Sequence, residues 1–439
     1  SLSQDGTKVA TAEYQAGAIY LKVYNTDGSD SGGSTLAKMP ADNTLGSIML
    51  SPDGHQLAYT KAIPGATPAD PSVGTQIWTL ATAGAALPVK IDESTDMLSL
   101  TAWHSGPIPQ TPNGVVQRLA GADRIGTAVA AADAAYNPHH PGTSHAKVAV
   151  ISRSDSFADA LAGNALAAQK HGPLLLTGSA SLDPMDAHEL STLLDAGSVV
   201  YVLGGPQALS PQLEAQIRAL GLTPKRLAGP DRFATATAIA AEVSPHPHTV
   251  LVATGANFPD ALAAGAAAAT DPDGGVVLLT NDKTVPAATR AYLDGVNPAS
   301  TKVYGVGRQG VAALGTTVLA GHFTPLAGDD RYATDLAVAN NTTLFPAPVA
   351  AGVATGENWP DALSGGAYIG ALKSPLLLTE HSLDNMGVSG SVVHADQWLT
   401  AHTLTLTQVS VFGGRAIFGD SFVKGFGNAA FGPGRFEVR

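Results

Sequence analysis

The sequence predicts an α/β protein of three tandem modules with parallel sheets, preceded by a smaller all-β region. Four short phrases recur three times in the same order, and short apolar runs alternate with Ala-rich helical stretches inside each copy. Before these copies, polar and apolar residues alternate along short segments that follow Asp-Gly pairs. We therefore expect a β-rich domain at residues 1–105, a Pro-rich linker at 106–115, and modules at 116–224, 225–323 and 324–439.

Composition excludes several classes of function. The net charge of −12 provides no basic field, so we expect no nucleic-acid partner. Cysteine is absent, which excludes disulfides and thiolate chemistry. No apolar, uncharged stretch is long enough for a membrane span. The chain begins at Ser1 without a signal peptide, as expected of either a mature form or a shortened chain.

The all-β region contains its own repeat. Leu2-Ser-Gln-Asp-Gly6 returns as Leu50-Ser-Pro-Asp-Gly54, and each copy precedes two predicted strands, at 8–14 and 18–24 and at 56–60 and 76–80. Asp-Gly is a hairpin signal, and this spacing suits the four-stranded blade of a propeller. About two blades fit before the linker, and residues 97–103 are the candidate start of a third. The region is either an open β layer or part of a propeller whose other blades are missing.

The three larger copies are defined by four phrases that keep one order. The first is Arg118-Leu-Ala-Gly-Ala-Asp-Arg124, Arg226-Leu-Ala-Gly-Pro-Asp-Arg232 and Leu326-Ala-Gly-Asp-Asp-Arg331. The second is Ser156-Phe-Ala-Asp-Ala-Leu161, Asn257-Phe-Pro-Asp-Ala-Leu262 and Asn358-Trp-Pro-Asp-Ala-Leu363. The third is Pro173-Leu-Leu-Leu-Thr177, Val276-Val-Leu-Leu-Thr280 and Pro375-Leu-Leu-Leu-Thr379, and the fourth is Val200–Gly205, Val303–Arg308 and Val409–Gly414.

Each copy predicts alternating helices and strands. In the first copy we expect helices at 124–136, 157–169, 184–196 and 211–220, with strands at 147–152, 174–177 and 199–203. Short apolar runs between helices indicate a parallel sheet that is buried on both faces and connected by right-handed crossovers.

Together, the phrases resemble the cell wall binding repeat type 2 family over residues 116–439. The resemblance implies Rossmann/Toprim-like modules in a pseudo-threefold arrangement that carry no cofactor. It implies a secreted, non-catalytic protein held non-covalently at the bacterial cell surface, as surface-layer proteins and wall hydrolases of the family are. The implied ligand is an anionic cell wall polysaccharide or a teichoic-acid-like polymer. The Asp-Gly repeats are similar to TolB-type and WD-repeat propeller blades.

Some positions depart from the family pattern, so we expect the modules to bind unequally. The first copy has Ile125 and Ala158 where the others have an aromatic residue and a proline. Arg308 replaces the second glycine of the second copy, and the Gly-rich end of the third copy, residues 425–439, matches the others poorly.

The aspartates of the second phrase are predicted to cap helices. Ser156, Asn257 and Asn358 are favourable N-cap residues, and Asp159, Asp260 and Asp361 then occupy the third helical position of a capping box. Contact with a ligand is the alternative role of these six residues.

Three arginines occupy one position of the repeat and are candidate ligand-binding residues: Arg124, Arg232 and Arg331. The guanidinium group suits phosphate or carboxylate. The alternative is an ion pair that joins modules around the pseudo-threefold axis. The aspartate before each arginine can cap the following helix.

Paired glycines end a strand in two copies, Gly204-Gly205 and Gly413-Gly414. They indicate either a turn with unusual backbone angles or the close approach of a ligand at the carboxyl end of a sheet. Residues 305–310 match a dinucleotide fingerprint, but the equivalent positions of the other copies do not, so we expect no such cofactor.

No motif predicts catalysis or a metal site. Residues 25–30 resemble a calcium loop but have no glutamate to close it, and the 13 histidines show no ligand spacing. His246-Pro-His248 is assigned to a Pro-rich loop. Two alternatives to wall anchoring stay open: a wall hydrolase or its modifier, and a scaffold whose N-terminal β domain binds a protein partner.

Overall fold

A computed structural model describes residues 3, 7–15, 17–30, 33–40, 45–51, 55–63, 74–82, 89–94, 114–139, 145–380, 392–432 and 434–439. The chain forms two compact units, Ser1–Gln110 and Thr111–Arg439. The predicted third blade at 97–103 lies outside the described residues, as do residues 106–113 of the predicted linker. Residues 114 and 115 of that linker already belong to a strand.

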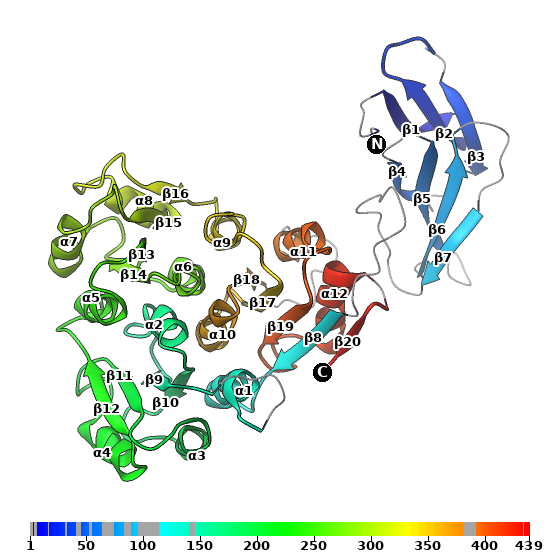
Figure 1. Ribbon diagram of the computed structural model, residues 1–439. Helices are drawn as coiled ribbons and strands as arrows, with labels where there is room; N and C mark the ends of the chain where they lie inside the picture. The colour runs from blue at the N-terminus through cyan, green and yellow to red at the C-terminus, as the bar shows by residue number, and fades with distance from the viewer. Residues whose placement is uncertain are drawn as a thin grey trace. The chain divides into compact units, whose positions relative to one another are not determined.

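The N-terminal unit contains two antiparallel meanders, which confirms the strands predicted there (Figure 1). The first sheet is β1 (Lys8–Gln15), β2 (Ala18–Asn25) and β3 (Ser34–Pro40) in that order. The second is β4 (Leu45–Leu50), β5 (Gln56–Ile63), β6 (Gly74–Ala81) and β7 (Val89–Ser94). Side chains of both sheets, including Leu21 and Leu57, share one buried cluster. The unit therefore has a small core of its own.

The C-terminal unit contains three parallel sheets, as predicted. One has the order β10 (Leu174–Thr177), β9 (Val148–Arg153), β11 (Val199–Leu203) and β12 (Thr223–Leu227). The next is β14 (Gly275–Thr280), β13 (Thr249–Thr254), β15 (Lys302–Val306) and β16 (Thr324–Leu326). The last is β18 (Leu376–Thr379), β17 (Ala350–Thr355), β19 (Gln408–Phe412), β8 (Gly114–Leu119) and β20 (Phe436–Val438).

Twelve helices cover these sheets in the described residues. They are α1 (Arg124–Tyr136), α2 (Gly163–Gln169), α3 (Pro184–Leu193), α4 (Pro211–Ala219), α5 (Arg232–Val243), α6 (Pro259–Ala269), α7 (Ala287–Asp294), α8 (Gly307–Leu314), α9 (Arg331–Ala339), α10 (Pro360–Ala371), α11 (Val392–Ala401) and α12 (Asp420–Phe431). None of them is long and apolar enough to cross a membrane. The helix expected at 157–169 begins only at Gly163.

Strand pairing divides the unit differently from the sequence repeats. Each copy begins with a strand that joins the sheet of another copy: β12 pairs with β11, β16 pairs with β15, and β8 pairs with β19. We therefore define module 1 as residues 124–227, module 2 as 232–326, and module 3 as 331–439 together with β8. Because β8 belongs to the last sheet, the three modules form a closed ring.

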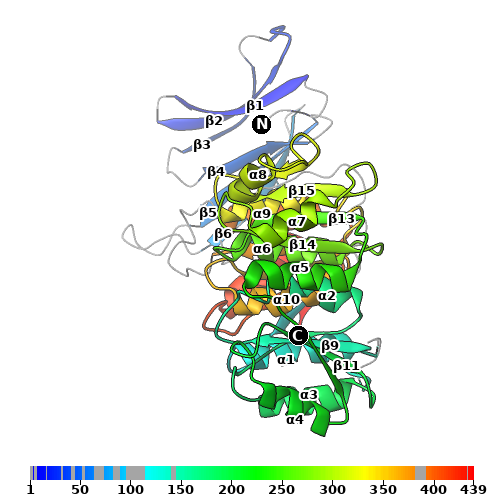
Figure 2. The ribbon, with the colours of Figure 1, turned by 90° about the vertical axis from the view of Figure 1, so that its left-hand side faces the viewer.

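The centre of the ring is built from three helices, α2, α6 and α10, which contact one another around an approximate threefold axis (Figure 1). A side view shows module 2 beside module 1, with α5 and α2 at their contact (Figure 2). Small residues allow this close approach: a Cβ on Gly370 of α10 would lie 2.5 Å from the Ala269 Cβ of α6. Asn164 of α2 fills the space left by Gly265 and Gly366 and is fully buried. The close packing of three helices rich in alanine and glycine, with Asn164 between them, fixes how the modules meet.

Candidate functional site

The same arrangement recurs where each module meets the next, at the carboxyl ends of its strands. The arginine that begins the first helix of one module lies over an aromatic ring of the preceding module. The guanidinium carbon to ring-centre distances are 5.5 Å for Arg232 and Phe157, 5.8 Å for Arg331 and Phe258, and 5.4 Å for Arg124 and Trp359. We name these places junctions 1–2, 2–3 and 3–1.

Each arginine also holds its own module. Its Nη1 donates to the carbonyl oxygen of Ser154, Gly255 or Gly356, at 2.7, 2.7 and 2.5 Å for Arg124, Arg232 and Arg331 respectively. The arginines thus take part in module contacts, through cation–π stacking rather than the ion pair that the sequence suggested. Contact with a ligand stays a prediction for them.

The three aromatic rings themselves meet near the axis. The Phe157 ring lies 5.7 Å from that of Phe258 and 6.2 Å from that of Trp359, both in edge-to-face geometry. In the sequence these residues appear only as members of the second phrase, and none was predicted to be a site residue. Their signal was the aromatic character at one position in all three copies.

The first phrase forms the entry to each helix. Asp123, Asp231 and Asp330 are N-caps whose carboxylates accept from backbone N–H groups of the first turn, which confirms the capping expected of them. A threonine hydroxyl near the start of the helix accepts a hydrogen bond from the backbone N–H of the glycine in the first phrase. This distance is 3.1 Å for Thr235 and Gly229. This local bonding fixes where each arginine begins its helix.

The capping box expected for the second phrase is not formed. Helices α6 and α10 begin at Pro259 and Pro360, because proline is pre-organised for the first helical position. Asp260 and Asp361 are therefore second helical residues. Asn257 and Asn358 lie one residue before the N-cap, where each Oδ1 accepts from the next backbone N–H at 2.9 Å.

Module 1 departs further from the predicted box. It has Ala158 in place of the proline, and α2 begins at Gly163, so Ser156 and Asp159 both precede the helix. The Ser156 Oγ accepts from the Ala158 N–H at 3.4 Å.

The three aspartates instead lie against the glycine that follows a central strand. A Cβ on Gly204 would lie 2.6 Å from Asp159 Oδ2, one on Gly307 would lie 1.9 Å from Asp260 Oδ2, and one on Gly413 would lie 3.1 Å from Asp361 Oδ2. These glycines have φ of +99°, +73° and +126°. Both the backbone conformation and the close carboxylate therefore require glycine.

The second glycines have no such role. Neither Gly205 nor Gly414 has a positive φ, a Cβ on Gly205 would meet nothing within 4 Å, and one on Gly414 only the Gly121 carbonyl at 3.9 Å. The predicted site residues thus gather at the junctions, with Gly204 and Gly413 in the turn and Gly205 and Gly414 beside it.

Burial changes the acidity of two of these carboxyl groups. It raises the pKa of Asp260 to about 6, against the lowering effect of Arg331. Burial also raises the pKa of Asp361, while the Thr127 hydroxyl and Arg124 oppose the change. At junction 2–3 the carboxyl group borders a cavity of about 280 Å³, which Arg308, Gln309, Asp329 and Arg331 also line.

At junctions 1–2 and 3–1 a second arginine donates a hydrogen bond to the glycine turn. Arg226 Nη1 donates to the Gly204 carbonyl at 2.7 Å, and Arg118 Nη1 donates to the Gly413 carbonyl at 3.2 Å. At the equivalent position of junction 2–3 the chain has Pro325, which offers no such donor. There Arg308, with its side chain 63% exposed, pairs with Asp329 instead.

We expect Gly307→Ala to lower the free energy of unfolding by about 3 kcal/mol, because it adds left-handed strain and displaces Asp260. Denaturant unfolding measures this. Gly321→Ala is the matched control, since Gly321 has φ +79° but open space around it. A cost equal to that of the control would contradict a structural contact between Asp260 and Gly307.

A model of the family "Cell wall binding domain 2 (CWB2)" matches residues 118–214, 226–316 and 326–423. The chain is 31% identical over 268 residues to the N-acetylmuramoyl-L-alanine amidase LytC of Bacillus subtilis (strain 168). The aligned region covers 60% of this chain and 50% of the amidase. It is 29% identical over 172 residues to the amidase enhancer of the same organism, covering 39% of this chain and 23% of the enhancer. The chain thus spans half or less of these relatives.

Two solved structures share the fold. Cwp6 from Clostridium difficile superposes with a TM-score of 0.60 and 17% identity, covering 97% of this chain and 68% of that one. Cwp8 from Clostridium difficile gives a TM-score of 0.58 and 17% identity, covering 96% and 80%.

Proposed function

Because this chain belongs to the cell wall binding domain 2 family, we propose that its three-module ring anchors the protein non-covalently by binding an anionic wall glycopolymer at the junctions. The chain is a cell-wall protein located outside the cell. One observation carries the proposal of binding at the junctions. A guanidinium group, a helix N-terminus and a left-handed glycine turn occur together at all three junctions.

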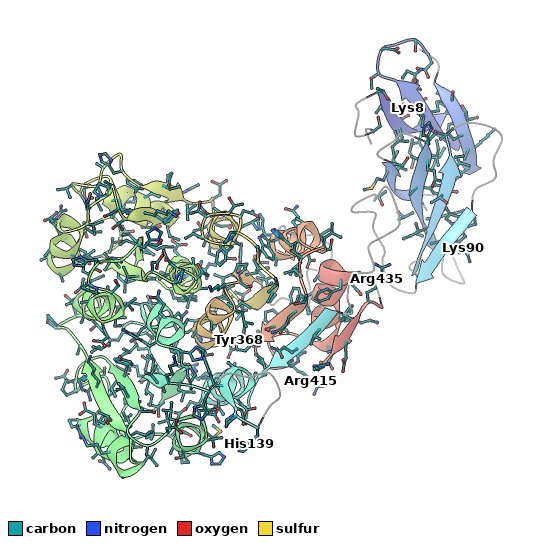
Figure 3. All side chains as sticks on the ribbon, viewed as in Figure 1. Lys8, Lys90, His139, Tyr368, Arg415 and Arg435 are labelled. Atoms are coloured by element: carbon teal, nitrogen blue, oxygen red, sulfur yellow. The ribbon has the colours of Figure 1, made fainter. Side chains whose placement is uncertain are left out.

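The charge distribution supports an anionic ligand at two of these places. The stacked arginines are partly buried and the N-cap aspartates occupy the first N–H groups, so a polymer would first meet the exposed cations. Arg308 follows Gly307 at junction 2–3, and Arg415 follows the Gly413 turn at junction 3–1, with side chains 63% and 79% exposed. Each is paired with an exposed aspartate, Asp329 or Asp420, which an anionic group of the polymer would displace. Figure 3 shows Arg415 at the end toward which β8 and β19 run.

Junction 1–2 has Gly205, Pro206 and Gln207 after its turn and no cation at these positions. We therefore propose unequal binding, with junctions 2–3 and 3–1 the stronger. Attachment at two places on one chain adds avidity, so modest contacts suffice.

We expect the full chain to co-sediment with purified walls and to lose binding once anionic polymers are extracted from them. The double variant Arg308→Ala/Arg415→Ala should weaken binding by roughly tenfold, with a smaller dependence on salt, because two charge contacts are lost. Arg218→Ala on α4 is the control, since its side chain is 59% exposed and lies outside the junctions. Undiminished binding to extracted walls would refute the anionic ligand.

A role in wall hydrolysis is the second candidate, favoured by the names of the curated relatives. The match covers half of the amidase, and wall binding by the shared part accounts for it equally well. Release of soluble fragments from purified walls by the full chain would favour hydrolysis over anchoring.

A further inference from the structure

Three potential metal ligands meet in module 2, on the side of the sheet away from the junction turns, where β13 begins and α6 ends. One ligand atom each from His248, Asp271 and Asp273 lies within 4.8 Å of the others. His248 Nδ1 is 2.9 Å from Asp271 Oδ2. We propose that these side chains bind a divalent transition-metal ion such as Zn²⁺.

The donor set suits this metal. Imidazole nitrogen and carboxylate oxygen are ordinary ligands of Zn²⁺, and three protein ligands leave one position open. The spacing of the donors is already short, so binding requires rotation of side chains and little movement of the backbone.

Neighbouring groups hold Asp271 in place before any ion arrives. Thr249 Oγ1 donates to Asp271 Oδ2 at 2.5 Å, and the Asp273 backbone N–H donates to Asp271 Oδ1 at 3.0 Å. The Asp271 side chain is 10% exposed. Such outer hydrogen bonds orient a ligating carboxylate and raise metal affinity.

Module 2 differs from the other modules in the loop that supplies Asp273. In each module the first two strands after the first helix pair with each other, which gives a fixed point for counting residues. Leu251 pairs with Val277 in module 2, Val150 pairs with Leu174 in module 1, and Val353 pairs with Leu377 in module 3. The chain between the paired positions is thus two residues longer in module 2. The two extra residues lie within residues 270–275, and the corresponding segments of modules 1 and 3, residues 169–172 and 371–374, contain no carboxylate, so the pair of aspartates is particular to module 2.

The ligands open into a hollow of about 430 Å³ whose other wall includes Thr343 and Leu344 of module 3. This space leaves room for water or an anion at the open coordination position. Lys302 and Lys373 also line the hollow, but both are exposed, so their ammonium groups can turn toward solvent when a cation enters. A structural His248–Asp271 ion pair alone would not need Asp273, which makes Asp273 the discriminating residue.

Calorimetric titration of the chelator-treated full chain with ZnCl₂ tests the proposal. We expect one saturable site whose affinity falls at least tenfold in Asp273→Asn and in His248→Ala. Asp273 is exposed and gives only its backbone N–H to the fold, so its variant stays folded even if His248→Ala does not. His322→Ala, an exposed histidine of the same module, is the control.

Substitution with Co²⁺ adds a readout of the ligands, because the visible spectrum of a four-coordinate site should appear in the wild type and be lost in Asp273→Asn. Absence of saturable Zn²⁺ uptake, or equal affinity in the wild type and Asp273→Asn, overturns the site. These readouts involve no cell walls, so they are independent of the anchoring function.

Discussion

Trp359→Ala is expected to lower the free energy of unfolding of the three-module ring by about 3–5 kcal/mol, the usual cost of removing a buried aromatic side chain. Trp359 is 8% exposed and makes two contacts with module 1. Its ring meets Phe157 of module 1 edge-to-face and carries the Arg124 guanidinium at 5.4 Å. The substitution therefore removes apolar burial, a ring pair and a cation–π contact together.

Denaturant unfolding followed by circular dichroism measures this loss. Trp359→Phe should recover most of the stability, because modules 1 and 2 have phenylalanine at the same position. Val318→Ala, at a side chain 65% exposed, is the control and should change little. A loss below about 1 kcal/mol for Trp359→Ala would show that the aromatic contacts do not hold the ring together.

Replacing Arg124, Arg232 and Arg331 by lysine together is expected to destabilise the ring by about 3–6 kcal/mol, or on the order of 1–2 kcal/mol per site. Lysine keeps the charge but loses the planar group that stacks on a ring while donating to a carbonyl. Each arginine makes both contacts, as Arg232 does with Phe157 and Gly255. The effects of single replacements should be partly coupled, because the rings on which the arginines stack contact one another.

Two measurements separate structure from ligand binding in this variant. Thermal unfolding reports the module contacts, and co-sedimentation of the folded protein with walls reports the ligand. If stability falls while binding per folded molecule is kept, the arginines belong to the junctions alone. Reduced binding without any loss of stability would contradict the contacts described above and assign the arginines to the polymer.

The order and type of the elements could be predicted because the repeats supply three versions of each pattern. Buried strands such as Val199–Leu203 and Leu174–Thr177 appear in the sequence as apolar runs, and the other two copies have similar runs at the same positions. Helix starts were harder to place, since the predicted caps Asn257 and Asn358 compete with prolines two residues later that fix the first turn.

The junctions were partly predictable. The sequence identified Arg124, Arg232 and Arg331 and left open whether they join modules, because a charge pattern does not reveal what lies above a guanidinium plane. The proximity of Asp260 and Gly307 depends on the starts of two helices, α6 and α8, which only the fold brings together. His248 and Asp271 are separated along the chain by a whole strand and helix, so no ligand spacing was visible.

The position of β8 sets the order in which the parts of the ring can fold. Val115 pairs with Gln408 and Glu437, so β8 is synthesised long before the two strands that it joins. Until then the last sheet has an open edge at β19 and no place for β20, and such unpaired edges promote aggregation. Contacts this distant along the chain form slowly. Ring closure is therefore the step at which a newly exported chain commits to its native form, and its two earlier modules, whose sheets are complete without β8, can form ahead of it.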